Sequence, residues 1–319
     1  MIIQILILIV GYIVLIKGAD IFVDGASATA SNFRVPKILI GLTIVAFGTS
    51  APEFGVSVNS IISNNHDIVF GNVIGSNILN ILLILGVSSM FHPLSLKNNT
   101  IKKELPLTIL LTTIFVVLLS DNIFDKNIIN AFPRSDGIIL CLFFLVFIYY
   151  LIALALKKND KKDEKDVKEM PLSKSLFFTV LGILMIVFGS SFVVNSASKI
   201  AEGIGVSEKL ISLTVIALGT SLPELVTSVT ATRKGEYDLA IGNVVGSNIF
   251  NLGIVVGIPV AIFGGTDIIN FNYIDLAVML VSTILLFIFS LNDRKITRRE
   301  GMIFLIMFIA YYSYVIISG

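Results

Sequence analysis

Apolar residues along the chain form long runs that are separated by short polar segments. A bilayer core of about 30 Å requires roughly 20 apolar residues per helix, so runs of this length predict membrane-spanning helices. The fold class is therefore predicted to be all-α, a polytopic membrane protein with ten transmembrane helices. These are expected at residues 2–31, 37–63, 68–91, 104–120, 137–156, 174–201, 208–231, 238–263, 274–290 and 301–317.

The two halves of the chain repeat each other. Residues 41–54 (GLTIVAFGTSAPEF) match residues 212–225 (SLTVIALGTSLPEL) at eight of fourteen positions, and residues 70–80 match residues 241–251 at eight of eleven. Such an internal repeat indicates two homologous structural units. It divides the chain into a first five-helix repeat at 1–156, a charged linker at 157–171 and a second five-helix repeat at 172–319.

Each predicted repeat contains five helices, which is an odd number. The second repeat must therefore enter the membrane from the side opposite to the first. This inverted topology is typical of secondary transporters, which place the substrate site near the midplane between the halves.

Composition and charge narrow the class further. The chain is 55% hydrophobic and 14% charged, whereas a soluble domain carries about 25% charged residues, so a soluble protein is excluded. The single cysteine, Cys141, rules out a disulfide framework or a cysteine-based metal site. Residues 157–169 (KKNDKKDEKDVKE) mix both charge signs without apolar periodicity, which predicts a solvated linker.

The basic residues are distributed unequally between the two sets of connections. The connections after the first, third, fifth, seventh and ninth helices hold eighteen Lys and Arg residues, and the opposite set holds Lys126, Arg134, Lys199 and Lys209. By the positive-inside rule the first set is cytoplasmic. We therefore predict a multi-pass protein of the cell membrane with both termini outside and the linker in the cytoplasm.

Two repeated passages place a carboxylate deep in an apolar run: Gly48 to Glu53 (GTSAPE) and Gly219 to Glu224 (GTSLPE). Ser-x-x-Glu with Pro in the first turn is a capping box, so each passage predicts a helix restart. Capping alone does not account for a carboxylate near the bilayer centre, which costs at least ~2.5 kcal/mol. Carboxylate, hydroxyl and freed carbonyl oxygens are hard ligands that suit Na⁺, Ca²⁺ or Mg²⁺, so we predict one cation site.

A second motif, Gly-Asn-x-x-Gly-Ser-Asn, occurs at 71–77 and 242–248. Its Gly-x-x-x-Gly spacing permits close helix contact. Ser76 and Asn80 are four residues apart and share a helix face, as do Ser247 and Asn251. These side chains could coordinate ions or hydrogen-bond to the broken backbone of the neighbouring span.

The doubled motifs resemble the alpha repeats of the cation/calcium antiporter superfamily, specifically the sodium/calcium exchangers, over the whole ten-helix layout. The resemblance implies exchange of Na⁺ for Ca²⁺ by alternating access, without enzymatic activity or a prosthetic group. Four central helices would form a core across which the first and sixth helices slide. The expected partners are the transported Ca²⁺ and Na⁺ and the lipid bilayer, with no nucleic acid and no obligatory protein partner.

The resemblance also implies a set of metal-binding residues. Two carboxylates bind Ca²⁺ together with two threonine carbonyls, alanine carbonyls and serine side chains form flanking Na⁺ sites, and two asparagines complete the centre. In that order, these residues are Glu53, Glu224, Thr49, Thr220, Ala46, Ala217, Ser50, Ser76, Ser221, Ser247, Asn80 and Asn251.

Asn251 decides the charge of this set, because the potassium-dependent branch of the superfamily has Asp there. An amide leaves only two acids, which argues against K⁺ co-transport. Two carboxylates balance one Ca²⁺ or two Na⁺, so a third Na⁺ would make exchange electrogenic.

Two alternatives remain open. A proton/calcium antiporter of the same superfamily could use the same glutamates, although such relatives carry an additional Glu where this chain has Gly75-Ser76 and Gly246-Ser247. A cation channel could use them as a selectivity ring.

Overall fold

The computed structural model describes residues 2–63, 66–121, 131–156, 170–205, 217–267 and 272–318. The α-helices are α1 (Ile2–Phe33), α2 (Lys37–Ile40), α3 (Ala46–Thr49), α4 (Ala51–Ile62), α5 (His66–Leu79), α6 (Gly86–Phe91), α7 (Leu105–Leu118), α9 (Arg134–Leu156), α10 (Leu172–Gly203), α12 (Ala217–Thr220), α13 (Leu222–Arg233), α14 (Tyr237–Phe250), α15 (Gly257–Phe263), α16 (Tyr273–Leu291) and α17 (Arg298–Ser318). Four π-helical segments are η1 (Gly41–Val45), η2 (Asn80–Leu85), η3 (Thr100–Glu104) and η5 (Asn251–Val256). Four two-residue strands are β1 (Leu94–Ser95), β2 (Ala131–Phe132), β3 (Thr266–Asp267) and β4 (Lys295–Ile296).

Seven helical spans in the described residues are long and apolar enough to cross a membrane. An eighth candidate is the pair Lys37–Thr49 and Ala51–Ile62, which bends by 46°. The prediction of an all-helical, multi-pass membrane protein is therefore confirmed at this level. The predicted segments 104–120 and 208–231 fall on the shorter helices α7 and α12–α13 and on residues outside the described part, so the count of ten stays a prediction. The linker prediction lies almost wholly outside the described residues.

Corresponding elements in the two halves have identical bounds when shifted by 171 residues. This holds for four pairs: α3 and α12, α4 and α13, α5 and α14, and η2 and η5. The same local sequence therefore produces the same local structure twice, even where that structure is a π-helix. Whether the halves are inverted relative to a membrane stays a prediction.

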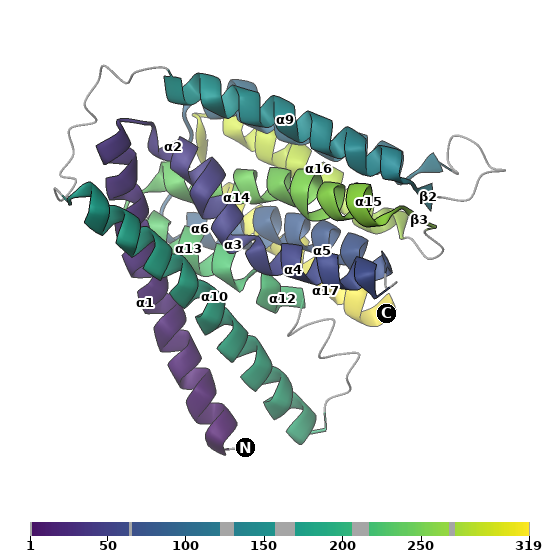
Figure 1. Ribbon diagram of the computed structural model, residues 1–319, viewed down its shortest axis with the longest axis horizontal. Helices are drawn as coiled ribbons and strands as arrows, with labels where there is room; N and C mark the ends of the chain where they lie inside the picture. Colours follow the sequence, from purple (N-terminus) through teal and green to yellow (C-terminus); the bar gives the residue numbers. More distant parts are fainter. Residues whose placement is uncertain are drawn as a thin grey trace.

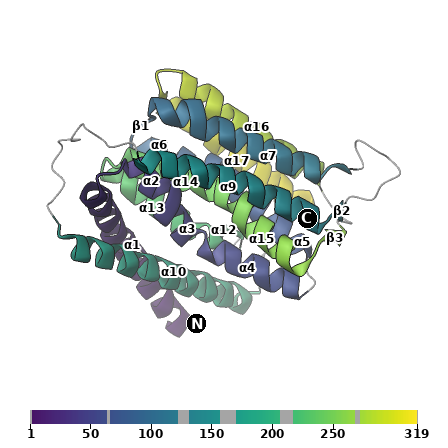
Figure 2. The ribbon, with the colours of Figure 1, turned by 45° about the horizontal axis from the view of Figure 1, so that its top comes forward.

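The long helices α1 and α10 form an antiparallel pair (Figure 1). Glycines of α1 recur every seven residues at this contact. Gly11 lies against Val193 of α10, and Gly25 lies against Thr179. Residue numbers therefore increase along α1 as they decrease along α10, as expected for antiparallel helices. In Figure 2 the pair lies on the side of the bundle opposite to α7 and α16. Glycine at the contact lets the two backbones approach closely.

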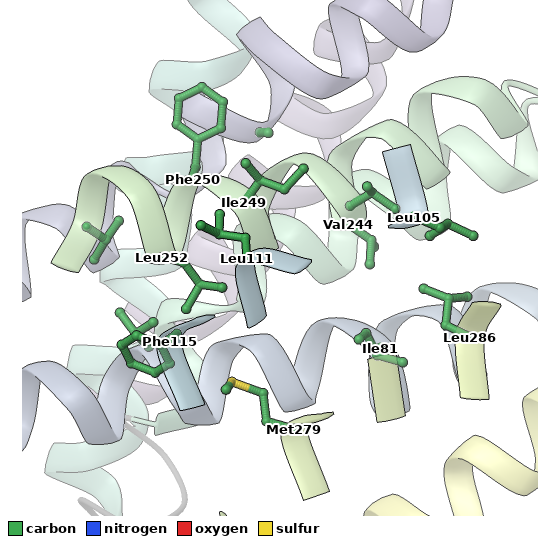
Figure 3. Packing of buried hydrophobic residues seen from close by; sticks show 14 of the residues in the cluster. Ile81, Leu105, Leu111, Phe115, Val244, Ile249, Phe250, Leu252, Met279 and Leu286 are labelled. Atoms are coloured by element: carbon green, nitrogen blue, oxygen red, sulfur yellow. The ribbon is translucent and has the colours of Figure 1, made fainter. Parts of the chain in front are cut away.

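The remaining helices pack around two central spans. The spans His66–Phe91 and Tyr237–Phe263 have 72% and 78% of their apolar windows buried, against 17–33% for the other five. Figure 3 shows Phe115 of α7 and Met279 of α16 beside these two spans, on the side where Leu252 lies. These two spans therefore form the centre of the bundle, and they carry the Gly-Asn-x-x-Gly-Ser-Asn motifs.

Short contacts tie the connecting segments together at each end of the bundle (Figure 2). At one end β1 pairs with β4, Lys97 binds Asp238 and Lys37 binds Glu236, so the connections after the first, third, seventh and ninth predicted helices meet. At the other end β2 pairs with β3, which joins the connections after the fourth and eighth. Connections predicted to share a side of the membrane thus lie together.

Candidate functional site

The two Pro-Glu passages are the points where helices break and restart. Helix α3 ends at Thr49 and α4 begins at Ala51, and Pro52 occupies the first turn, where its missing N–H is not needed. The backbone helix resumes with Phe54 N donating to Ser50 O at 3.1 Å. In the second half α12 and α13 repeat this geometry around Ser221. The predicted restart is therefore present in both halves.

The capping-box interpretation is wrong for the serine side chains. Neither Ser50 nor Ser221 makes a side-chain cap hydrogen bond. The Ser50 hydroxyl instead donates to Oε1 of Glu224 at 3.0 Å. Ser50 therefore bonds to a carboxylate of the second half of the chain and not to its own helix.

Glu53 and Glu224 are both buried, with 0% and 1% of their surface exposed. Glu224 Oε1 accepts hydrogen bonds from Ser50 at 3.0 Å and Ser247 at 3.4 Å. Its Oε2 and both carboxylate oxygens of Glu53 have no hydrogen-bond partner among the described residues. None of the described Lys or Arg residues forms an ion pair with either glutamate.

The serines equivalent to Ser50 and Ser247 behave differently in the other half. Ser221 and Ser76 correspond to them by the 171-residue shift, but their hydroxyls bond each other at 3.3 Å. The hydrogen bonds of the serines are thus asymmetric: two hydroxyls donate to Glu224 in one half, and the equivalent two bond each other in the other half.

Asn80 and Asn251 begin the π-helical segments η2 and η5. The Asn80 amide donates to Asn248 Oδ1 at 2.9 Å, and the Asn251 amide donates to Asn77 Oδ1 at 3.0 Å. The Oδ1 atoms of both Asn80 and Asn251 are buried without a partner. π-helical segments often occur at functional sites, but the sequence pattern does not predict them.

The first asparagine of each Gly-Asn-x-x-Gly-Ser-Asn motif hydrogen-bonds to the backbone of a broken helix. Asn72 Nδ2 donates to Glu53 O at 3.4 Å, and Asn243 Nδ2 donates to Glu224 O at 3.3 Å. Asn243 also accepts from the Thr49 hydroxyl at 3.0 Å. Sequence reasoning assigned no individual role to Asn72 and Asn243, or to Asn77 and Asn248, although all four lie in the repeated motif.

The remaining predicted residues lie on the same elements. Ala46 begins α3 and packs against Gly246, whose added Cβ would lie 2.7 Å from the Ala46 Cβ. Ala217 and Thr220 begin and end α12, and the side chain of Ala217 is outside the described part. Hydrogen bonds therefore connect the four predicted serines with Glu224 or with each other. Asn80 and Asn251 bond instead to Asn248 and Asn77, which the sequence had not singled out.

Together these residues leave a group of buried oxygens that lack donors. They are Glu53 Oε1, Glu53 Oε2, Glu224 Oε2, Asn80 Oδ1 and Asn251 Oδ1. A buried acceptor without a partner costs about 1–3 kcal/mol, and more when it is charged. All five are hard oxygen atoms of the kind that Na⁺ and Ca²⁺ prefer as ligands.

Comparison with known proteins identifies the family of this chain. The family described as "Sodium/calcium exchanger protein" matches residues 3–153 and 174–317. The sodium/calcium exchanger MaX1 of Methanosarcina acetivorans is 31% identical over 338 residues and 96% of each chain. The inner membrane protein YrbG of Escherichia coli is 36% identical over 287 residues, which covers 87% of this chain and 86% of YrbG.

A solved structure gives the same result for the fold. The sodium-calcium exchanger NCX_Mj, soaked with Na⁺, superposes with a TM-score of 0.85 at 29% identity and covers 98% of both chains. The predicted resemblance is confirmed by these similarities and by the two family matches, one in each half. The chain belongs to the sodium/calcium exchanger family.

Proposed function

We propose that this protein is a secondary active antiporter that exchanges Na⁺ for Ca²⁺ by alternating access. The observation that carries the proposal is the group of five buried acceptor oxygens without hydrogen-bond donors. Two of the five belong to Glu53, one to Glu224 and two to asparagines, so the group combines negative charge with neutral ligands. Such a set is costly when empty and favourable when a hard cation fills it. A transported ion needs a site of this kind at the centre of the bundle.

In this proposal the ligands are the twelve residues implied by the family resemblance. Glu53 and Glu224 share Ca²⁺ with the carbonyls of Thr49 and Thr220, and Asn80 and Asn251 complete the centre. The flanking Na⁺ sites use the carbonyls of Ala46 and Ala217 and the hydroxyls of four serines. These are Ser50, Ser76, Ser221 and Ser247. The asymmetric serine contacts support the idea that Glu224 is held in place while Glu53 is free to receive an ion.

We further propose ten transmembrane helices in two inverted repeats, at 1–156 and 172–319, with a cytoplasmic linker at 157–171. The 171-residue correspondence of helix bounds supports the repeat. The two strand pairs support the sidedness, because each joins only connections predicted to lie on one side. The basic connections then place both termini outside the cell membrane.

The charge of the site carries the last part of the proposal. Two carboxylates and two amides hold one Ca²⁺ or two Na⁺ in balance, so a third Na⁺ leaves a charge of +1 on the loaded site. Exchange of three Na⁺ for one Ca²⁺ is then electrogenic and responds to voltage by ~2.3 kcal/mol per charge per 100 mV. The amide at Asn251 makes transport independent of K⁺.

Flux of ⁴⁵Ca²⁺ in proteoliposomes with imposed Na⁺, K⁺ or H⁺ gradients tests these statements. We expect uptake driven by a Na⁺ gradient, with a current, and its loss in Glu53→Gln. The matched control is Glu104→Gln, because Glu104 is also fully buried but bonds Tyr150 away from the centre. This control should keep its flux. Uptake driven by a pH gradient without Na⁺ would instead support a proton/calcium antiporter, and a single-channel current would support a channel.

A further inference from the structure

We propose that Asn77 and Asn248 are positioning residues that force the Asn251 and Asn80 amides to present oxygen, rather than nitrogen, to the cation. The inference rests on the proposed function, because it concerns the same site. An amide side chain has one accepting face and one donating face, and only the accepting face can bind a cation. Something must therefore decide which face points to the site.

Four asparagines form a hydrogen-bonded chain between the two central spans, with Asn77 and Asn248 in the middle and Asn251 and Asn80 at its ends. Asn251 donates to Asn77 Oδ1 at 3.0 Å and Asn80 donates to Asn248 Oδ1 at 2.9 Å. Asn77 Nδ2 faces the backbone oxygen of Asn248 at 3.5 Å, and Asn248 Nδ2 faces that of Asn77 at 3.5 Å. All four side chains are at most 2% exposed, so water does not compete for these groups.

The backbone carbonyls of Asn77 and Asn248 set the direction of the hydrogen bonds along this chain. A carbonyl oxygen only accepts, so Asn77 and Asn248 must turn their amide nitrogens toward it. Their Oδ1 atoms then point the other way, toward Asn251 and Asn80. Asn251 and Asn80 must therefore donate from their amide nitrogens to these oxygens, because two acceptors that face each other would both lack a hydrogen bond.

The last step leaves the oxygens of Asn80 and Asn251 free. Both Oδ1 atoms are buried and have no partner among the described residues, as expected if they are held for an ion. If either amide reversed, its NH₂ group would take the position of the unpartnered oxygen, and a donor there cannot bind a cation. Asn77 and Asn248 therefore orient the cation ligands Asn251 and Asn80 without touching the cation themselves.

A double-mutant cycle tests this role by exchanging the amide for a carboxylate, which has no donating face. In the wild-type background, Asn77→Ala should weaken Ca²⁺ binding by about 10-fold or more, because the Asn251 amide is free to reverse. In the Asn251→Asp background the same change should cost less than about 3-fold, because either carboxylate oxygen can bind the ion. Equal losses in both backgrounds would show that Asn77 serves only packing and would overturn the proposal.

The mirrored cycle, Asn248→Ala with Asn80→Asp, repeats the test from the other half. Calcium binding is measured by ⁴⁵Ca²⁺ titration of detergent-purified protein whose folding is checked by gel filtration and far-UV circular dichroism. If an alanine variant misfolds both alone and together with its paired aspartate substitution, the asparagine is needed for folding, and this result also counts against the proposal.

Glu53→Gln separates this inference from the proposed function. If the wild-type protein binds no Ca²⁺, or binds it equally well after Glu53→Gln, the proposed function fails and the inference fails with it. If Glu53→Gln abolishes binding but both cycles show equal losses, only the positioning role is refuted.

Discussion

The contact between α1 and α10 depends on glycine, and replacement of Gly182 tests it directly. A Cβ added at Gly182 would lie 2.5 Å from Phe22 Cβ, 2.6 Å from its Cα and 2.7 Å from its backbone nitrogen. Carbon atoms in favourable contact are about 3.5–4.0 Å apart, so the helices must separate locally by about 1 Å. Two of the three clashing atoms belong to the backbone of α1, and therefore a rotamer change cannot relieve the contact.

The expected magnitude follows from two opposing terms. Overpacking of this kind costs about 1–3 kcal/mol. Alanine is favoured over glycine in a helix interior by about 1 kcal/mol, which offsets part of the loss. Gly182→Ala should therefore lower the free energy of unfolding by up to about 2 kcal/mol, and Gly182→Leu should lower it further.

The matched control is Gly55→Ala in α4. Gly55 is exposed, and an added methyl group meets no described atom within 4 Å. The control should be neutral or stabilised by up to about 1 kcal/mol from helix propensity alone. Denaturant unfolding in detergent micelles, followed by far-UV circular dichroism, compares the variants, since the chain contains no Trp for fluorescence. Equal unfolding free energies for Gly182→Ala and Gly55→Ala would refute the close-contact argument.

Two further predictions concern buried hydrogen bonds. Ser50 donates to the Glu224 carboxylate, whereas Ser221 donates to another hydroxyl. In the absence of Na⁺ and Ca²⁺ we therefore expect Ser50→Ala to lower the unfolding free energy by about 1.5–3 kcal/mol and Ser221→Ala by about 0.5–1.5 kcal/mol. Equal losses for the two variants would contradict the asymmetry of the serine hydrogen bonds. Tyr150→Phe removes the hydroxyl donor of the buried Glu104 carboxylate and should cost about 1.5–3 kcal/mol by the same measurement. An unchanged stability would show that the pair contributes nothing.

The long helices were predictable because apolar composition is a property of the local sequence. The runs at 2–31 and 174–201 agree with α1 and α10 within two residues at each end. The π-helical segments at Asn80 and Asn251 could not be predicted in this way. Their hydrogen-bond pattern departs from that of the α-helix without a distinct hydrophobic period, and their first residues bond across to the opposite half.

The sequence repeat predicted candidate site residues but not the contacts that they make. An identical motif in each half predicts identical surroundings, yet Glu224 accepts two serine hydroxyls while the equivalent serines near Glu53 bond each other. Such asymmetry depends on how the halves meet, which no local pattern records. The second Gly-x-x-x-Gly motif does pack closely, since an added Cβ at Gly242 would lie 2.9 Å from Gly41 Cα. The equivalent segment facing the first motif, at 212–216, lies outside the described residues.

In the exchanger that we propose, the amides at Asn80 and Asn251 suit the electrostatics of a buried site that must also release its ion. Each additional carboxylate would carry a desolvation penalty of several kcal/mol and would repel Glu53 and Glu224 whenever the site is empty. An amide oxygen supplies a ligand without that charge, but it brings a donating face that could oppose the cation. In our proposal the chain of four asparagines removes this disadvantage, because Asn77 and Asn248 are oriented by backbone carbonyls, which cannot reverse. A site built from two acids and two oriented amides can therefore hold a divalent ion at neutral net charge and still be empty at tolerable cost.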